Sequence, residues 1–405
     1  MRVQYHLVAA AALSLQAASC GASYALNSSW MAASIMSRRQ GIMTGAGGSS
    51  ELLQAGFTQK AFTAFVSQYP SNHLSPAISK YIKESAASVV PFVLNATNDA
   101  LSYPLDRLSN GNALLALSNS SSYGTAGANQ TQYRQAADAL RRSIDLNRRN
   151  YEGGLWYFVY PEWSYLDGMY SLAPFYTLYS TTVGYNGTAL EDVQLQLDLL
   201  WQHTRNASSG LLVHGYDASR TAVWADPVTG ASPHVWDRSL GWFAMALIDS
   251  IELLPASVSK YSKLRQRLHE MIQALAGPLI EAADSNTGAW WQVMDEPGRA
   301  GNYIESSGSA LFSYALLKSA RLGLLSAEVA ANASIVGKRA QQYLTDAFVV
   351  KEANGTLGYN GTVSVCSLNS TASYEYYVGQ PINYNSILGS AAYILASLEV
   401  ERLKV

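Results

Sequence analysis

Charge is scarce in this chain. Of its 405 residues only 14% are charged, and the formal net charge is −2. The sequence has no Lys/Arg run of the kind that follows a phosphate backbone, so we expect no nucleic-acid partner. Beyond the first residues, no apolar stretch has the length that a membrane span needs. We therefore expect no membrane partner either.

Metal-ligand and nucleotide motifs are also missing. The six histidines form no H-x-x-x-H pair and there is no cysteine cluster, which argues against zinc. Neither a G-x-S-x-G elbow nor a phosphate-binding loop is present. We expect no cofactor and no metal, and neither an esterase nor a nucleotide-binding protein.

Only two cysteines occur, Cys20 and Cys366. The first 22 residues combine an early Arg, an apolar run and small residues, which predicts a secretory signal peptide; a buried first helix is the alternative. If Cys20 leaves with the signal, no intrachain disulfide can form. Stability must then come from the core, for which 48% hydrophobic residues provide ample material.

Glycosylation motifs are dense. The N-x-Ser/Thr pattern occurs at Asn27, Asn95, Asn119, Asn129, Asn186, Asn206, Asn332, Asn354, Asn360 and Asn369. Such density in a chain of low charge predicts a secreted, extracellular and N-glycosylated protein.

Helical periodicity dominates what is present. Apolar residues recur at three- and four-residue spacing in 132–149 and 258–283, which predicts amphipathic helices. Four times the chain repeats one unit: a Gly, a short aromatic strand-like piece, a loop, and an apolar helix rich in small residues. We predict an all-α (α/α)6 barrel, a toroid of helical hairpins, as a single domain over 28–405. We expect a monomer or a weak homodimer.

In such a ring, residues just before the inner helices should line one central funnel. The candidates are aromatic, acidic or basic: Asp106, Trp163, Tyr165, Asp167, His214, Tyr216, Asp217, Trp236, Asp237, Arg238, Trp242, Trp290, Trp291, Gln292, Glu305 and Ser306. Aromatic faces cover the C–H faces of a sugar ring, and carboxylates handle protons. This composition predicts a carbohydrate site.

The order of several motifs is more specific. "LDGMY", "HGYD", "WDRSLGW", "NYIESSGSALFSYAL" and "YEYYVGQPINYNSILG" follow one another after about Leu101. In this order they resemble glycoside hydrolase family 105, the unsaturated rhamnogalacturonyl hydrolases, in a fungal-type secreted form. The resemblance implies an (α/α)6 barrel that removes 4,5-unsaturated galacturonic acid from the non-reducing end of lyase-generated rhamnogalacturonan oligosaccharides.

The resemblance also implies roles for residues. Asp167 is implied as the general acid and base, which protonates C4 of the enol ether and then takes a proton from the water that adds at C5. Asp106 is implied beside it as a second carboxylate. Because two nearby carboxylates disfavour double ionisation and the aromatic surround desolvates both, we expect one pKa to rise.

Substrate-binding residues are implied in the same way. The matches place His214, Trp236, Arg238 and Trp242 around the unsaturated ring, with Arg238 suited to the uronate carboxylate. The chain departs from the family pattern at two further positions. Tyr165 stands two residues before Asp167 where a Trp is frequent, and Asp237 stands where a Gly is common.

Plainer interpretations remain open for these residues. Asp167 and Asp106 each precede a helix and are candidates for N-caps. His214 is a candidate for a hydrogen-bonded structural histidine, and Arg238 for an ion pair with Asp237, Asp226 or Asp217. The tryptophans suit the core equally well. Glu305 resembles a helix-capping residue as much as a ligand, and we leave it out of the catalytic set.

Two rival functions also remain open. One is an unsaturated β-glucuronyl hydrolase acting on other unsaturated uronyl oligosaccharides. The other belongs to a different class, a secreted carbohydrate-binding protein without catalysis, in which Asp167 only caps its helix.

Overall fold

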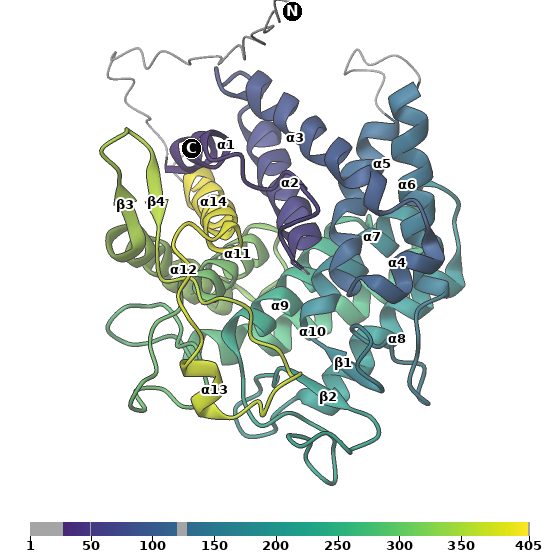
Figure 1. Cartoon of the computed structure of the whole chain (residues 1–405). Coiled ribbons are helices and arrows are strands. Elements are labelled where there is room, and N and C mark those ends of the chain that lie inside the picture. The colour runs from purple at the N-terminus through teal and green to yellow at the C-terminus, as the bar shows by residue number, and fades with distance from the viewer. Residues whose placement is uncertain (1–26, 49, 120–127, 404–405) are drawn as a thin grey trace, which may run out of the picture.

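The computed structural model describes residues 27–48, 50–119 and 128–403. The predicted signal peptide, with Cys20, lies outside these described residues. The described chain is mostly helical, and its strands are short pairs near the loops (Figure 1). The predicted all-α barrel in a single domain is confirmed.

Six helical segments form a closed inner ring in which each contacts the next and the last contacts the first. In order they are α2 (Glu51–Gln68), η2 (Leu105–Asn110) continued by α5 (Gly111–Asn119), α7 (Asp167–Thr182), α9 (Asp237–Glu252), α11 (Ser306–Arg321) and α14 (Ile387–Arg402).

An outer helix packs on each inner one. The outer helices are α1 (Asn27–Ser37), α3 (Ser75–Val89), α6 (Ala128–Asp145), α8 (Gly187–Thr204), α10 (Ser262–Glu281) and α12 (Ala327–Phe348). The helices predicted over 132–149 and 258–283 correspond to α6 and α10, and the short turn η4 (Ser259–Tyr261) precedes α10. Since α1 packs on α14, the two ends of the barrel meet, as Figure 1 shows.

The inner helices are buried on nearly all sides, because they are rich in small residues. Every residue of α9 from Asp237 to Ile251 is buried, as is every residue of α11 from Ser306 to Ser319. At Gly111 of α5, an added Cβ would overlap the ring of Phe175 in α7. A side chain there would push the two helices apart, so the close approach requires glycine.

Short strands connect the loops that precede inner helices. β1 (Trp163–Tyr165) pairs antiparallel with β2 (Gly215–Asp217), and Ser164 lies opposite Tyr216. Trp236 forms an isolated bridge with Val293 in the same loop layer. These pairs hold the N-terminal ends of neighbouring inner helices at one mouth of the barrel.

Three further short helices and a hairpin complete the described chain. They are η1 (Val90–Phe92), α4 (Ala96–Ser102) and α13 (Tyr374–Val378), with the hairpin of β3 (Val349–Lys351) and β4 (Leu357–Tyr359). Within the described ranges, no helix combines the length and the apolar character that crossing a membrane requires.

Candidate active site

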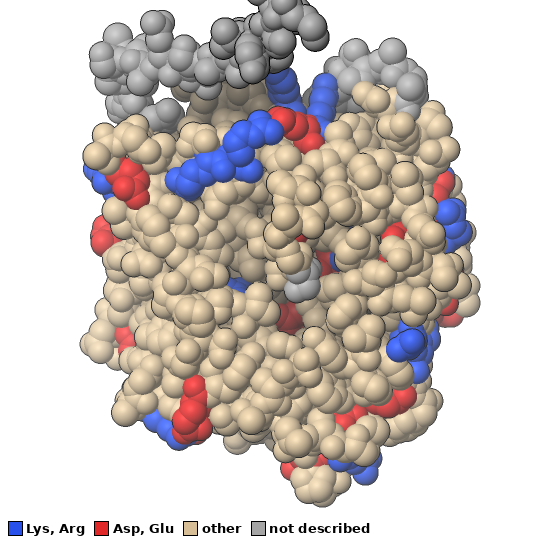
Figure 2. All heavy atoms as spheres, viewed as in Figure 1, with Lys and Arg blue, Asp and Glu red and all other residues tan. Residues whose placement is uncertain are grey.

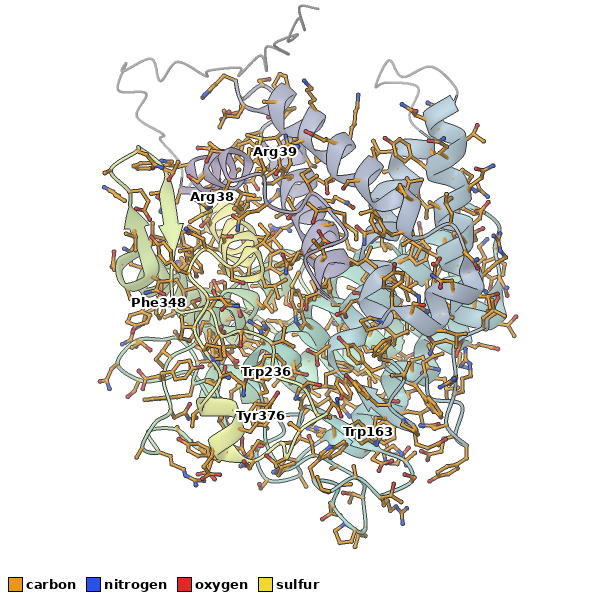
Figure 3. All side chains as sticks on the ribbon, in the orientation of Figure 1. Arg38, Arg39, Trp163, Trp236, Phe348 and Tyr376 are labelled. Carbon is orange, nitrogen blue, oxygen red and sulfur yellow. The ribbon has the colours of Figure 1, made fainter. Side chains whose placement is uncertain are left out.

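A cavity of about 180 Å³ opens where the inner helices begin. Residues at or just before the starts of α2, η2, α7, α9 and α14 line it, as the repeated unit predicts. Figure 2 shows a hollow near the centre of one face with acidic atoms recessed in it. Figure 3 places Trp236, Tyr376 and Trp163 in the lower half of the molecule, near β1, β2 and α13. The predicted funnel is therefore present at this mouth.

Asp167 is the first residue of α7, but its side chain does not cap that helix. Its Oδ2 accepts a hydrogen bond from the Ser239 hydroxyl at 2.6 Å, and the same atom lies 3.1 Å from Nε2 of His214. The carboxylate lines the cavity and its side chain is 12% exposed. The N-cap alternative is therefore wrong for Asp167, because residues from outside α7 hold the carboxylate toward the cavity.

Asp106 lies in the same cavity and is buried. Its Oδ2 accepts a hydrogen bond of 2.8 Å from the Tyr157 hydroxyl, while Oδ1 has no hydrogen-bond partner. No side-chain cap forms at η2, so the N-cap alternative is wrong here too. Burial raises the pKa of Asp106 to about 7, helped by the charge of Asp167 and opposed by the Tyr157 hydrogen bond and Arg107. The rise in pKa expected for one carboxyl of the pair thus falls on Asp106.

His214 is fully buried and does not line the cavity. Its Nδ1 lies 2.7 Å from the Tyr377 hydroxyl, and its Nε2 faces Asp167. The imidazole therefore connects the carboxylate to α13, and its neighbours match the hydrogen-bonded alternative. A direct contact between His214 and sugar stays a prediction.

Three of the predicted aromatic residues line the cavity: Tyr165, Trp236 and Trp242. Tyr165 stacks on Tyr157 with ring centroids 4.4 Å apart and an interplanar angle of 8°. Trp236 donates from Nε1 to the side-chain oxygen of Gln292, which fixes its ring. Tyr165 and Trp236 are thus held in place beside the cavity, and their contact with a sugar stays a prediction.

The remaining predicted tryptophans have other places. Trp290 is a core residue whose indole nitrogen donates to the carbonyl of Leu279, and it packs on Phe312. Trp163 packs edge-on against Trp224 in a satellite cluster, and Trp291 pairs with Ile304 through a backbone bridge. The core alternative is thus correct for Trp290.

Arg238 lines the cavity, yet it is 1% exposed. One terminal nitrogen donates to the carbonyl of Val363 and to the Ser307 hydroxyl, and the other donates to the carbonyl of Ser364. The guanidinium therefore holds the segment that continues into the cavity wall at Val365, Cys366 and Ser367. Binding of the uronate carboxylate by Arg238 stays a prediction. It would be a second role, beside the contacts that hold this segment.

The acidic partner of Arg238 is Glu305, at 3.9 Å, and not Asp237, Asp226 or Asp217. Asp217 and Asp226 instead accept hydrogen bonds from backbone N–H groups of their own loops. Sequence proximity suggested the wrong partner, because Glu305 lies 67 positions further along the chain and reaches Arg238 only when α9 and α11 pack together.

Glu305 is the N-cap of α11, which is the first of the two roles left open for it: its carboxylate accepts from the backbone N–H of Gly308 at 2.7 Å. It also accepts from the N–H of Val363 at 2.9 Å, so the cap holds the same wall segment as Arg238.

The side chain of Asp237 does not line the cavity. It is fully buried against α11, where a Cβ on Gly308 would overlap its carboxylate. Burial, followed by the neighbouring charge of Glu305, raises the pKa of Asp237 well above its usual range. The departure from the family pattern at Asp237 therefore lies outside the residues that line the cavity.

Several contacting residues were missed by sequence reasoning. Tyr157, Ser239 and Tyr377 hold the two aspartates and the histidine, and the 363–367 segment forms one wall. Ser239 lies within "WDRSLGW" and Tyr377 within "YEYYVGQ", so both motifs contained the signal, without a role attached to these positions.

Comparison with known proteins agrees with this arrangement. The family model described as Glycosyl Hydrolase Family 88 matches residues 54–404, which is most of the chain. The chain belongs to glycosyl hydrolase family 88. It is therefore a glycoside hydrolase, and the family 88 model covers all six inner helical segments except the first turn of α2.

Individual relatives extend the comparison. Protein Atu3128 of Agrobacterium fabrum and the 24.9 kDa protein in picA locus of Rhizobium radiobacter are each 38% identical over 232 residues, covering 56% of this family 88 chain and 96% of each relative. A solved glycoside hydrolase from family 105 of C. acetobutylicum ATCC 824 is 29% identical, with a TM-score of 0.79 over 93% of this chain and 99% of that one.

The unsaturated glucuronyl hydrolase of Bacillus sp. GL1 shares the fold with this family 88 hydrolase. Its TM-score is 0.61 at 13% identity, over 93% of this chain and 95% of that one. The comparisons thus support the fold and the grouping with families 88 and 105 that the sequence resemblance implied. The rhamnogalacturonyl specificity and the fungal-type secreted form stay predictions.

Proposed function

We propose that this family 88 hydrolase removes the 4,5-unsaturated galacturonic acid from the non-reducing end of lyase-generated rhamnogalacturonan oligosaccharides. The observation that carries the proposal is the pair Asp106 and Asp167 in one aromatic-lined cavity. Burial raises the pKa of Asp106 to about 7, and the side chain of Asp167 does not cap α7. A protonated Asp106 adds no negative charge beside the uronate carboxylate, which favours binding of an acidic sugar at neutral pH.

In the proposed mechanism, Asp167 donates a proton to C4 of the enol ether and the positive charge develops at C5 and the ring oxygen. Water adds at C5 and returns a proton to Asp167, which gives a hemiketal. Opening of the hemiketal yields a ketone at C5, and the C1 hemiacetal then releases the aglycone as an alcohol. One carboxyl suffices for both proton transfers. Ser239 and His214 hold that carboxyl in place.

A second candidate is the hydrolysis of unsaturated glucuronyl ends. It is favoured by the family 88 match and by the fold shared with the Bacillus sp. GL1 protein, which is described as an unsaturated glucuronyl hydrolase. The alternative of a carbohydrate-binding protein without catalysis assumed that Asp167 only caps its helix. Asp167 does not cap α7, so this assumption does not hold.

The test uses the ultraviolet absorbance of the unsaturated uronate, which hydration of the double bond erases. Wild type and Asp167→Asn are mixed with an unsaturated rhamnogalacturonan disaccharide and, separately, with an unsaturated glucuronyl disaccharide. We expect wild type to erase the band faster for the galacturonyl substrate, and kcat of Asp167→Asn to fall by about 10²- to 10⁴-fold with a similar KM. Faster turnover of the glucuronyl substrate would exchange the two candidates, and full activity of Asp167→Asn would reject the mechanism.

We also propose that the protein is extracellular and N-glycosylated. All ten sequon asparagines lie at exposed positions, where an oligosaccharide can be accommodated. Intact-mass measurement before and after enzymatic deglycosylation of secreted protein tests this, and an unchanged mass would reject it.

A further inference from the structure

A second cavity, of about 320 Å³, lies at the other mouth of the barrel. It is lined by the C-terminal parts of α2, α9, α11 and α14 and by residues of α5 and α7. The catalytic cavity lies at the N-terminal ends of these inner helices, so the barrel core separates the two. The volume falls near the lower end of the range of about 300–1,000 Å³ that is typical of small-molecule pockets.

The walls of the second cavity carry an excess of positive charge. Asp249 is shared by Lys60 at 2.7 Å and Lys318 at 2.9 Å, and Lys318 also contacts Glu252 at 2.6 Å. Lys318 is nearly buried, and Lys60 is only 26% exposed in its side chain. The lysines thus face the cavity in a setting where charge is weakly screened.

Two arginines repeat the arrangement across the cavity. Arg321 binds Glu399 through two nitrogens, at 2.7 and 2.9 Å, while Nε of Arg402 lies 3.7 Å from the same carboxylate and has no hydrogen-bond partner. With Lys60 and Lys318, the four cations outnumber the three acids that line the cavity by one. The side chains of the lining therefore carry one formal positive charge in excess.

Uncharged polar atoms in the walls also lack partners. Oε1 of Gln59 and Oγ of Ser171 have no hydrogen-bond partner, although each residue is only 1% exposed. Oδ1 of Asn112 lacks one as well, and all three residues line the cavity. Buried polar groups without partners are unfavourable, so this lining favours a molecule with hydroxyl groups over an apolar one.

We propose that this second cavity binds a sugar acid: one ring, one carboxylate and several hydroxyl groups. The lysine and arginine side chains of the lining attract the carboxylate, and the hydroxyl groups lie against the polar side chains of Gln59 and Asn112. The buried side chain of Tyr170 lines the same space. This site does not depend on the proposed function, because it shares no lining residue with the catalytic cavity.

The experiment is titration calorimetry of the full chain with D-galacturonate and D-glucuronate, and with D-galactose as the uncharged counterpart. Arg402→Gln removes the cation with the unpartnered Nε. Arg267→Gln is its matched control: Arg267 lies on α10, pairs with Asp198, and is 30% exposed in its side chain compared with 33% for Arg402. Ala113→Leu fills the cavity without changing charge.

We expect saturable binding of the sugar acids, weakened about tenfold by Arg402→Gln, since a charge-assisted hydrogen bond contributes about 1.5–3 kcal/mol. We expect Ala113→Leu to abolish this binding, and Arg267→Gln to leave it unchanged. D-Galactose should bind at least about tenfold more weakly for the same reason.

Three results would overturn the proposal: no saturable binding of either acid, equal binding of galactose, or binding that Ala113→Leu and Arg402→Gln both leave unchanged. The last result would place the ligand outside the second cavity. Thermal melts identify a variant that fails to fold; if Ala113→Leu does, the comparison of Arg402→Gln with Arg267→Gln decides. Because turnover is measured separately by absorbance, failure of this site and failure of the proposed function are distinguishable.

Discussion

At the scale of single residues, the two aspartates of the active site differ in what surrounds them. Asp167 has a hydroxyl donor and an imidazole beside its carboxylate and retains some exposure. Asp106 is buried, has one phenol donor, and leaves one oxygen without a partner. Burial disfavours the charged form of a carboxyl, and a single donor does not compensate, which explains the raised pKa of Asp106.

Asp106→Asn tests this raised pKa through stability. A folded pKa of about 7 lies above the usual value of 3.8, so protonated Asp106 favours the folded state. That contribution is fully present below pH 3.8 and is lost as the pH rises through about 7. We expect Asp106→Asn to be more stable than wild type at pH 8, by up to about 4 kcal/mol, and to lose this advantage near pH 4.

Denaturant unfolding at both pH values measures the difference. A constant difference between Asp106→Asn and wild type from pH 4 to 8 would contradict the raised pKa.

Tyr157→Phe tests the same group through activity. The Tyr157 hydrogen bond opposes the effect of burial on the pKa of Asp106, so its removal should raise that pKa further. We expect activity to fall as pH rises through about 7 in wild type, and this fall to move to higher pH in Tyr157→Phe. The measurement is kcat/KM against pH.

Tyr160→Phe is the matched control for Tyr157→Phe, because Tyr160 also lines the cavity but does not bond Asp106. Equal pH profiles for the two variants would remove the proposed role of the Tyr157 hydroxyl.

At the scale of elements, the start of α11 has two functions. Glu305 caps the helix and also accepts from the backbone of Val363, next to the wall segment that Arg238 holds. We expect Glu305→Ala to lower the free energy of unfolding by about 1–3 kcal/mol and to raise KM, because the wall loses a support. Urea unfolding and steady-state kinetics measure the two effects.

Ser326→Ala is the control for Glu305→Ala. Ser326 caps outer helix α12 by accepting from Val329, and it does not line the cavity. We expect the free energy of unfolding of this variant to fall by about 0.5–2 kcal/mol and its KM to stay unchanged. A rise in KM of the same size for both variants would mean that capping in general, and not the wall contact, affects substrate binding.

At the scale of the whole molecule, Asp249 connects three inner helices, through Lys60 of α2 and Lys318 of α11. Burial alone would raise the pKa of Asp249, but Lys318 and Lys60 outweigh it and hold the pKa well below its usual range. A depressed pKa contributes stability above the unfolded value near 3.8, and the contribution is lost as the pH falls below it. The network therefore stabilises the barrel at neutral pH.

We expect Asp249→Asn to lower the free energy of unfolding by about 3–5 kcal/mol at pH 7, since the two lysines would lose the carboxylate that they share. The cost should shrink as the pH falls below about 4, where wild type begins to lose the same contribution. Asp145→Asn, in an exposed pair with Arg141, should change stability by less than about 1 kcal/mol. Unfolding curves at pH 7 and pH 3 measure this, and a pH-independent cost would contradict the depressed pKa.

Much of the fold and part of the site were predictable from the chain, because they rest on local patterns. Three- and four-residue periodicity with small apolar residues is enough for paired inner and outer helices, and it predicted α6 and α10. The place of a residue just before an inner helix is enough to bring Asp106, Asp167 and Trp236 to one mouth. The family resemblance rests on the order of the motifs.

Only the tertiary structure decided which neighbours each of these residues has. Arg238 faces Glu305 and the carbonyls of 363–364, and His214 faces Tyr377, across separations that no local pattern encodes. The pKa of Asp106 depends on burial by distant segments, and the second cavity exists only where the six inner helical segments close the ring. Helix formation follows from near neighbours in sequence, whereas burial, charge pairing and cavities depend on the closure of the ring.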